Sequence, residues 1–206
     1  MVAQQALWLE LPGGRHQAVL DKALSPSKGL AFVAHPHPLF GGTMDNKVVQ
    51  TLSRALVQSG WDCLRFNFRG VGQSEGVYDE GRGETDDVLQ ALRQLAPEGP
   101  LALAGFSFGA FVTCQVVAQL WPTQRIHKIL LVGTAVGNFD PAPVPSELHD
   151  ACLVVHGESD DTVALSAVMQ WASLQALPVT VVPHCGHFFH GQLPLLKSLA
   201  LRHLRA

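Results

Sequence analysis

Charged residues are scarce in this sequence. Asp, Glu, Lys and Arg make up 15% of the 206 residues, and the formal net charge is −3. The Lys and Arg residues are scattered, so no basic run could follow a phosphate backbone. This distribution argues against a nucleic-acid-binding protein, and we expect no nucleic-acid partner.

Long hydrophobic runs are also absent from the sequence. No apolar stretch approaches the roughly 20 residues that span a bilayer. The opening MVAQQALWLE lacks the basic and then apolar pattern of a secretory signal. We therefore expect a cytoplasmic chain with no membrane partner. Hydrophobic residues still make up 47% of the chain, which is normal for an α/β fold whose strands are buried on both faces.

Cysteine is sparse and widely spaced. Cys63, Cys114, Cys152 and Cys185 form no CxxC pair, so reduced, packed thiols are expected rather than disulfides. The sequence contains no internal repeat, low-complexity tract or interdomain linker. Because 206 residues are enough for one compact core, we predict a single domain over residues 1–206.

Turn residues separate two kinds of hydrophobic pattern. Short alternating runs at 6–11 and 17–21 flank the sequence PGGR, which predicts a β-hairpin. Beyond it, apolar runs of strand length alternate with segments of helical period, which predicts a mostly parallel eight-stranded sheet with helices on both faces. The further expected strands are 29–35, 62–68, 101–106, 126–133, 151–157 and 178–183, and the expected helices are 46–60, 84–96, 109–120, 164–174 and 192–204.

The segment GFSFG lies where a predicted buried strand passes directly into a predicted helix. A sharp strand-to-helix turn strains its middle residue and brings strand and helix close together, so Gly105 and Gly109 can lie where a side chain could not. The hydroxyl of Ser107 would then stand above the carboxyl edge of the sheet as a nucleophile. A glycine-flanked structural serine is the alternative, and the strand–turn–helix context favours the nucleophile.

A serine nucleophile needs a base and a carboxylate that orients the base. The sequence ESDDTV follows the expected strand 151–157 and supplies three carboxylates. Spacing from the strand end favours Asp160. Asp161 is the alternative, although it is better explained as a loop or helix N-terminal charge, and Glu158 is less favoured than both.

Three histidines follow the last expected strand, in HCGHFFHG. His187 fits the base, because it comes a few residues past the strand and after a flexible glycine. His184 directly abuts the strand and His190 lies where the last helix begins, so we expect surface or capping roles for them. The H-x2-H-x2-H spacing also suits a metal, but a set of nearby cysteine or carboxylate ligands is missing. We expect no metal and no other cofactor.

An oxyanion needs two amide donors, and the amide of Phe108, at the start of the helix, can be the first. The second should come from HPHPLFGGTMDN, where Pro36 and Pro38 have no amide to donate. The amide of His37 lies between them, with that of Leu39 as an alternative. The imidazoles of His35 and His37 could instead bind a metal, but two are too few for a site.

With these residues in place, the chain resembles the α/β-hydrolase superfamily, and within it small bacterial serine hydrolases related to dienelactone hydrolase and to prolyl-oligopeptidase catalytic domains. The segments that carry the resemblance span nearly the whole chain: HPHPLFGGTMDNKVV, LRFNFRGVGQSEG, GFSFGA, HGESDDTV and HCGHFFHG. The resemblance implies Ser107, Asp160 and His187 as the triad and His37 and Phe108 as oxyanion donors. Dienelactone hydrolases use cysteine as nucleophile, so the serine here disfavours that activity.

Superfamily members often insert a helical cap after the sixth strand. The matching segment here, 133–150, has three prolines and no helical period, so an ordered loop and an open site without a lid are expected. An open site favours short-chain or otherwise accessible esters. Leu39, Phe40, Phe139 and Phe188 are the expected substrate contacts.

The sequence therefore predicts a serine carboxylesterase that acts through an acyl-enzyme on a small-molecule ester. A thioesterase or a hydrolase of small peptides or aminoacyl amides is the alternative, because the same triad cleaves those bonds. A noncatalytic binding protein of the same fold is less favoured, since such proteins usually lack a triad member. We expect a monomer, although the hairpin edge could pair into a weak homodimer.

Overall fold

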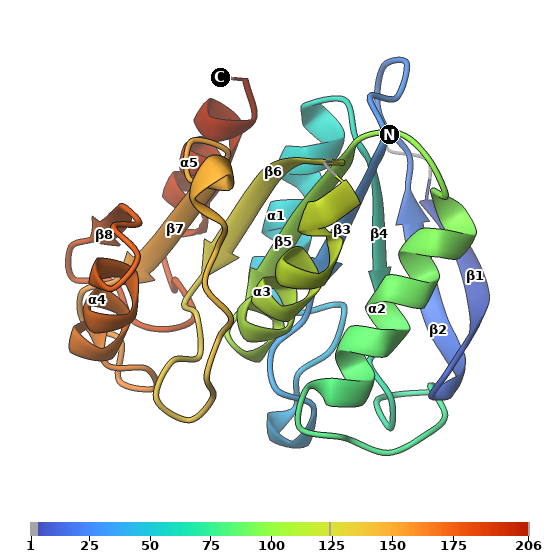
Figure 1. Cartoon of the computed structure of the whole chain (residues 1–206), viewed down its shortest axis with the longest axis horizontal. Helices are drawn as coiled ribbons and strands as arrows, with labels where there is room; N and C mark the ends of the chain where they lie inside the picture. The colour runs from blue at the N-terminus through green and yellow to red at the C-terminus, as the bar shows by residue number, and fades with distance from the viewer. Residues whose placement is uncertain (1–3, 124, 206) are drawn as a thin grey trace.

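The computed structural model describes residues 4–123 and 125–205. Within these residues, eight strands form one sheet in the order β1-β2-β4-β3-β5-β6-β7-β8 (Figure 1). The strands are β1 (Gln4–Leu11), β2 (Gly14–Asp21), β3 (Leu30–Ala34), β4 (Asp62–Phe66), β5 (Leu101–Phe106), β6 (Ile126–Val132), β7 (Cys152–Gly157) and β8 (Val179–Val182). β1 pairs with β2, and β2 with β4, in the antiparallel sense, and all other pairs are parallel. The predicted fold class is confirmed.

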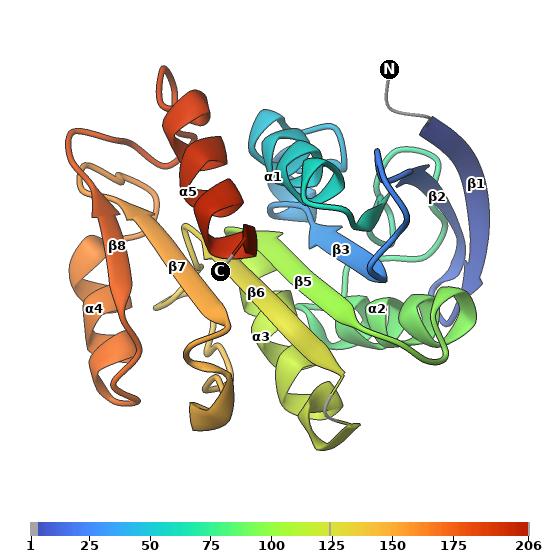
Figure 2. The same ribbon diagram turned by 90° about the horizontal axis from the view of Figure 1, so that it is seen from above.

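Helices cover both faces of the sheet. They are α1 (Lys47–Gln58), α2 (Arg82–Leu95), α3 (Phe108–Leu120), α4 (Leu165–Ser173) and α5 (Leu193–Arg205), with short 3-10 turns η1 (Pro38–Phe40), η2 (Trp121–Thr123) and η3 (Ser146–Leu148). Figure 2 shows α1 and α5 on one face and α2, α3 and α4 on the other. No helix among the described residues is long and apolar enough to cross a bilayer.

The central strands are buried on both faces because their neighbouring side chains belong to two different cores. Phe32 of β3 and Leu103 of β5 pack in the core under α2, α3 and α4. Val33 and Ala104, the next residues along, pack in the core under α1 and α5. A strand between two helical layers needs apolar side chains on both faces, so its sequence is a continuous apolar run. These strands could be predicted for that reason. The carboxyl end of β5 is thereby held rigidly from both sides.

The hairpin is longer than expected, because Leu11 pairs directly with Gly14. The alternating pattern was obscured by His16, a polar residue at an inward-facing position. His16 is fully buried, and its Nε2 lies 3.3 Å from Oδ2 of Asp87 in α2. The same carboxylate accepts hydrogen bonds from the amide of Gly13 and from Nε of Arg69, each at 2.8 Å. These polar contacts connect the hairpin and the loop after β4 to α2.

The segment between β6 and β7 forms no cap. Residues 133–150 contain the turn η3 and one isolated bridge between Val136 and Phe139, and no α-helix. The expected lidless architecture is confirmed. The carboxyl ends of the parallel strands therefore stay uncovered by any inserted helical layer.

Candidate active site

The turn between β5 and α3 consists of one residue, Ser107. Its backbone has φ +57° and ψ −119°, a region that residues with a side chain rarely adopt. A Cβ on Gly105 would overlap the carbonyl oxygen of Gly109, and a Cβ on Gly109 would overlap that of Ala34. Both glycines are therefore required by the close approach of strand and helix.

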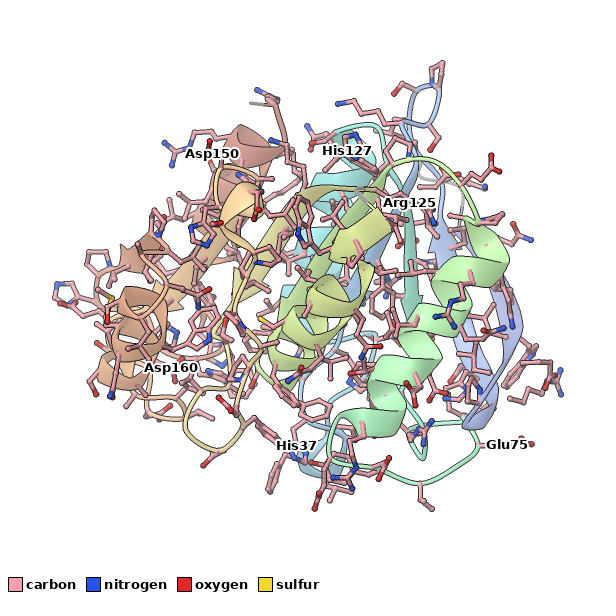
Figure 3. The ribbon with its side chains drawn as sticks, in the orientation of Figure 1. His37, Glu75, Arg125, His127, Asp150 and Asp160 are labelled. Carbon is pink, nitrogen blue, oxygen red and sulfur yellow. The ribbon has the colours of Figure 1, made fainter. Side chains whose placement is uncertain are left out.

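The structure brings together Ser107, His187 and Asp160 from three loops that follow β5, β8 and β7. Oγ of Ser107 lies 2.9 Å from Nε2 of His187, and Nδ1 of His187 lies 2.7 Å from Oδ2 of Asp160. Figure 3 shows Asp160 at the lower end of the sheet together with His37, whereas Arg125, His127 and Asp150 lie at the opposite end. The three side chains meet where open α/β sheets place their ligands.

The contacts of His187 define its protonation pattern. Nδ1 faces a carboxylate oxygen that can only accept, so it carries the proton. In the neutral ring, the lone pair of Nε2 then accepts from the hydroxyl of Ser107. The ring also packs against Phe106, with centroids 4.9 Å apart. The imidazole is thus oriented to take a proton from the hydroxyl.

The carboxylate of Asp160 is buried and fully engaged. Its Oδ1 accepts the amides of Thr162 and Val163 at 2.9 and 2.8 Å, and its Oδ2 accepts from His187. Burial raises the pKa of Asp160, but the hydrogen bonds from His187 and from the two amides outweigh burial and leave this pKa below its ordinary value. The group therefore stays charged beside the imidazole.

The alternative carboxylates and histidines lie elsewhere. Asp161 is exposed, and its carboxylate lies near the hydroxyl of Thr162 at 3.4 Å. Oε2 of Glu158 accepts the amide of His184, whose side chain is exposed. His190 is exposed as well.

The loop that carries His37 lies against the start of α3. The carbonyl oxygen of His37 accepts the amides of Phe40 and Gly42 at 3.1 and 3.0 Å, which makes a tight turn. The rings of His37 and Phe108 are 5.0 Å apart. Within the described ranges, neither the amide of His37 nor that of Phe108 has a hydrogen-bond acceptor. Both amides are therefore free to donate to a ligand.

The structure does not support His35 as a metal ligand. Its Nδ1 donates to the carbonyl oxygen of Pro36 at 2.6 Å, and its Nε2 accepts the amide of Phe68 at 2.9 Å. Burial lowers the pKa of His35 to about 4, so the ring is neutral. In the part of the chain that the structure describes, no group of three or more His, Cys, Asp or Glu side chains is placed to hold a metal ion.

Two of the expected substrate contacts lie beside site histidines: the ring of Phe40 is 4.7 Å from that of His37, and the ring of Phe188 is 5.1 Å from that of His187. Leu39, Phe40 and Phe188 are exposed, and Phe40 is the most exposed of them at 84%. Phe139 is partly buried and stacks on Phe111, with ring centroids 4.8 Å apart. The ring of Phe108 is fully buried and packs 5.2 Å from that of Phe139. The surroundings of Ser107 are therefore rich in aromatic side chains.

Tyr78 is a site residue that the sequence analysis missed. Nδ1 of His37 accepts the amide of Leu39 at 3.2 Å, so in the neutral ring Nε2 carries the proton and faces the hydroxyl of Tyr78 at 3.1 Å. Tyr78, Phe111 and Phe139 line a groove of about 440 Å³ together with polar and charged residues. The other lining residues are Glu80, Arg82, Gln115, Asn138 and Asp140. No sequence signal pointed to Tyr78, which lies in an irregular loop.

His156 of β7 is a second residue that was missed. It is fully buried, and its Nε2 lies 3.5 Å from Oδ2 of Asp160. A histidine inside an apolar strand resembles an ordinary core residue, so the sequence offered no reason to connect it with the carboxylate.

Comparison with known proteins agrees with the fold described above. A family model described as "alpha/beta hydrolase fold" matches residues 39–151. An uncharacterized protein of Rickettsia prowazekii (strain Madrid E) is 36% identical over 166 residues, which cover 76% of this chain and 67% of that protein. A serine hydrolase without lid from Xanthomonas campestris has a TM-score of 0.87 at 34% identity, over 98% of this chain and 94% of that one. A serine hydrolase homologue from Coxiella burnetii has a TM-score of 0.82 at 32% identity, over 99% and 98%.

Proposed function

Because the chain belongs to the α/β hydrolase fold family, we propose that it is a serine hydrolase that cleaves carboxylic esters through an acyl-enzyme. One observation carries this proposal. Oγ of Ser107, the imidazole of His187 and the carboxylate of Asp160 are joined by contacts of 2.9 and 2.7 Å at the carboxyl edge of the sheet. The likeness to a lidless serine hydrolase at 34% identity supports it.

In the proposed mechanism, Oγ of Ser107 forms a bond to the ester carbonyl carbon while Nε2 of His187 takes the hydroxyl proton. The charge of Asp160 stabilises the imidazolium. The amides of His37 and Phe108 stabilise the negative oxygen of the tetrahedral intermediate. The intermediate collapses as Nε2 returns the proton to the departing alcohol, which leaves the acyl group on Oγ of Ser107. Water then attacks the acyl carbon while Nε2 takes a proton from it, and collapse of the second tetrahedral intermediate releases the acid as Nε2 returns the proton to Oγ.

We further propose that the substrates are short or otherwise accessible esters that enter the open site. The proposed reaction uses no cofactor. Leu39, Phe40 and Phe188 would contact the substrate because they are exposed, and Phe139 because it lines the groove beside Tyr78. Free thiols throughout the described residues favour the cytoplasm. One sheet with helices on both faces favours a single domain, and we propose that it acts as a monomer or a weak homodimer.

The direct test is Ser107→Ala, assayed with p-nitrophenyl acetate and butyrate. We expect kcat/KM to fall by a factor on the order of 10³ or more. Ser159→Ala, at an exposed serine in the loop after β7, is the matched control and should keep full activity. A fluorophosphonate probe should label the native protein and leave the Ser107→Ala variant unlabelled. Full turnover by that variant would overturn the proposal, and an unlabelled native protein would favour a noncatalytic binding role.

The bond that is cleaved can be identified with substrates that share one acyl group. Butyryl esters, thioesters and amides place the same acyl chain against the aromatic side chains near Ser107 and differ only in the leaving group. We expect the ester to give the highest kcat/KM. A thioester or an amide that reacts faster would reassign the activity to the corresponding class.

A further inference from the structure

His156 lies next to two groups of the loop that follows β7, the carbonyl of Val163 and the carboxylate of Asp160. Its Nε2 lies 3.0 Å from the carbonyl oxygen of Val163 and 3.5 Å from Oδ2 of Asp160. Both partners can only accept, so Nε2 carries a proton. Its Nδ1 is buried and has no partner among the residues described. The ring is therefore neutral, with one directed N–H group.

From this geometry we propose that His156 is a positioning residue, whose Nε2–H holds the Val163 peptide, and through it the carboxylate of Asp160, in the orientation that His187 needs. This inference rests on the proposed hydrolase function.

The positioning is carried by the Val163 peptide. The amide of Val163 donates to Oδ1 of Asp160 at 2.8 Å, and its carbonyl oxygen accepts from His156 at 3.0 Å. His156 lies within β7 and is held by the sheet, whereas Asp160 lies in the loop. The imidazole thus connects the loop peptide that orients Asp160 to a rigid strand, and an unanchored carboxylate would loosen His187 in turn.

The same nitrogen of His156 also lies near the oxygen that His187 uses. Its hydrogen bond goes to the Val163 carbonyl at 3.0 Å, and its distance to Oδ2 of Asp160 is 3.5 Å. The positive end of the N–H dipole therefore lies close to the carboxylate oxygen that accepts from Nδ1 of His187 at 2.7 Å, and it stabilises the negative charge there. The charged or titratable groups that act on His156 are Asp160 and His187.

The proposed role of His156 requires its ring to be neutral. Burial lowers the pKa of His156. The Val163 carbonyl and Asp160 oppose that shift, and a positive charge on His187 adds to it. A second imidazolium would also leave the Nδ1–H without an acceptor among the described residues. Only His187 is therefore expected to carry positive charge during turnover.

Three substitutions separate positioning from simple packing. His156→Gln can place an amide N–H near the position of Nε2. His156→Asn is also polar but too short to reach the Val163 carbonyl, and His156→Phe fills the space without any donor. We expect kcat to fall on the order of tenfold in the Asn and Phe variants, with substantial recovery in Gln.

Nitrogen-15 NMR of the native protein measures the tautomer of His156 directly and needs no variant. We expect His156 to be protonated at Nε2 and unprotonated at Nδ1. The opposite tautomer would overturn the proposal, and so would an Asn variant that folds and keeps the native kcat. Failure of the proposed function looks different: the native protein would be inactive, or Ser107→Ala would be fully active, whatever the tautomer of His156.

Discussion

Oδ2 of Asp160 lies 2.7 Å from Nδ1 of His187, while Oδ1 of the same carboxylate accepts the amides of Thr162 and Val163. The two oxygens therefore have different tasks. Because the amides need an acceptor, they determine which end of an amide side chain would face the histidine if Asp160 were replaced by asparagine.

We predict that Asp160→Asn lowers kcat by about 10³- to 10⁴-fold. The Oδ1 atom of the asparagine would keep the loop amides, so its NH2 group would face Nδ1 of His187. The imidazole would then accept at Nδ1 and carry its proton on Nε2, where it could not take the proton of Ser107. Steady-state kinetics with p-nitrophenyl butyrate measure the loss.

Asp161→Asn is the matched control, because Asp161 is the exposed neighbour that the sequence left as an alternative. It should keep nearly full activity. If Asp161→Asn lost activity and Asp160→Asn did not, the assignment of the acid would be wrong.

The sequence predicted the sheet well because the central strands β3 and β5 are buried on both faces, and because α1 and α2 each have one apolar side. The strand ends were also informative: Ser107, Asp160 and His187 each follow a strand, and the carboxyl ends of parallel strands share one edge. Local pattern cannot report contacts between segments distant in sequence. Tyr78 meets His37 across an irregular loop, and His156 lies within an apolar run, so neither could be linked to the site before the fold was known.

A second prediction concerns acid stability and His35. In the folded chain the pKa of His35 is lowered to about 4 from 6.5, so the unfolded chain binds the proton more tightly. The titration of His35 therefore leaves the free energy of unfolding unchanged above about pH 6.5. It lowers this free energy as the pH drops toward 4, by about 3 kcal/mol in total. His35→Gln should be less stable at pH 8 but should show a shallower decline.

Urea denaturation at several pH values between 8 and 4.5 measures both slopes. The lowered pKa of Asp160 also reduces stability on acidification, so the native decline will not vanish in the variant. The test is the difference between the two slopes from pH 6.5 to 4.5. Identical slopes would show that His35 does not stay neutral in the folded chain.

The third prediction concerns the hydroxyl of Tyr78, which lies 3.1 Å from Nε2 of His37. Tyr78→Phe keeps the ring and removes the acceptor, leaving the half-buried Nε2–H of His37 unpaired. We expect a loss of about 1 kcal/mol in the free energy of unfolding. Because the same loop carries the His37 amide, kcat/KM should fall several-fold, mostly through kcat. An unchanged kcat would show that the hydroxyl does not hold this loop in place.

The last prediction uses Gly133, which follows β6 and has φ +55°. A Cβ there would lie 3.2 Å from Cε1 of His187 and 3.3 Å from Cε2 of Phe106, so Gly133→Ala should push the imidazole away from Ser107. These contacts require a shift of a few tenths of an ångström. Because a displacement of about 1 Å can cost about 100-fold in rate, we expect kcat to fall about fivefold. Gly137 has φ +94°, and a Cβ on it would meet no atom within 4 Å. Gly137→Ala should therefore show backbone strain of about 1 to 2 kcal/mol while keeping its kcat. Equal losses of kcat in the two variants would mean that strain in the loop, and not displacement of His187, lowers the rate.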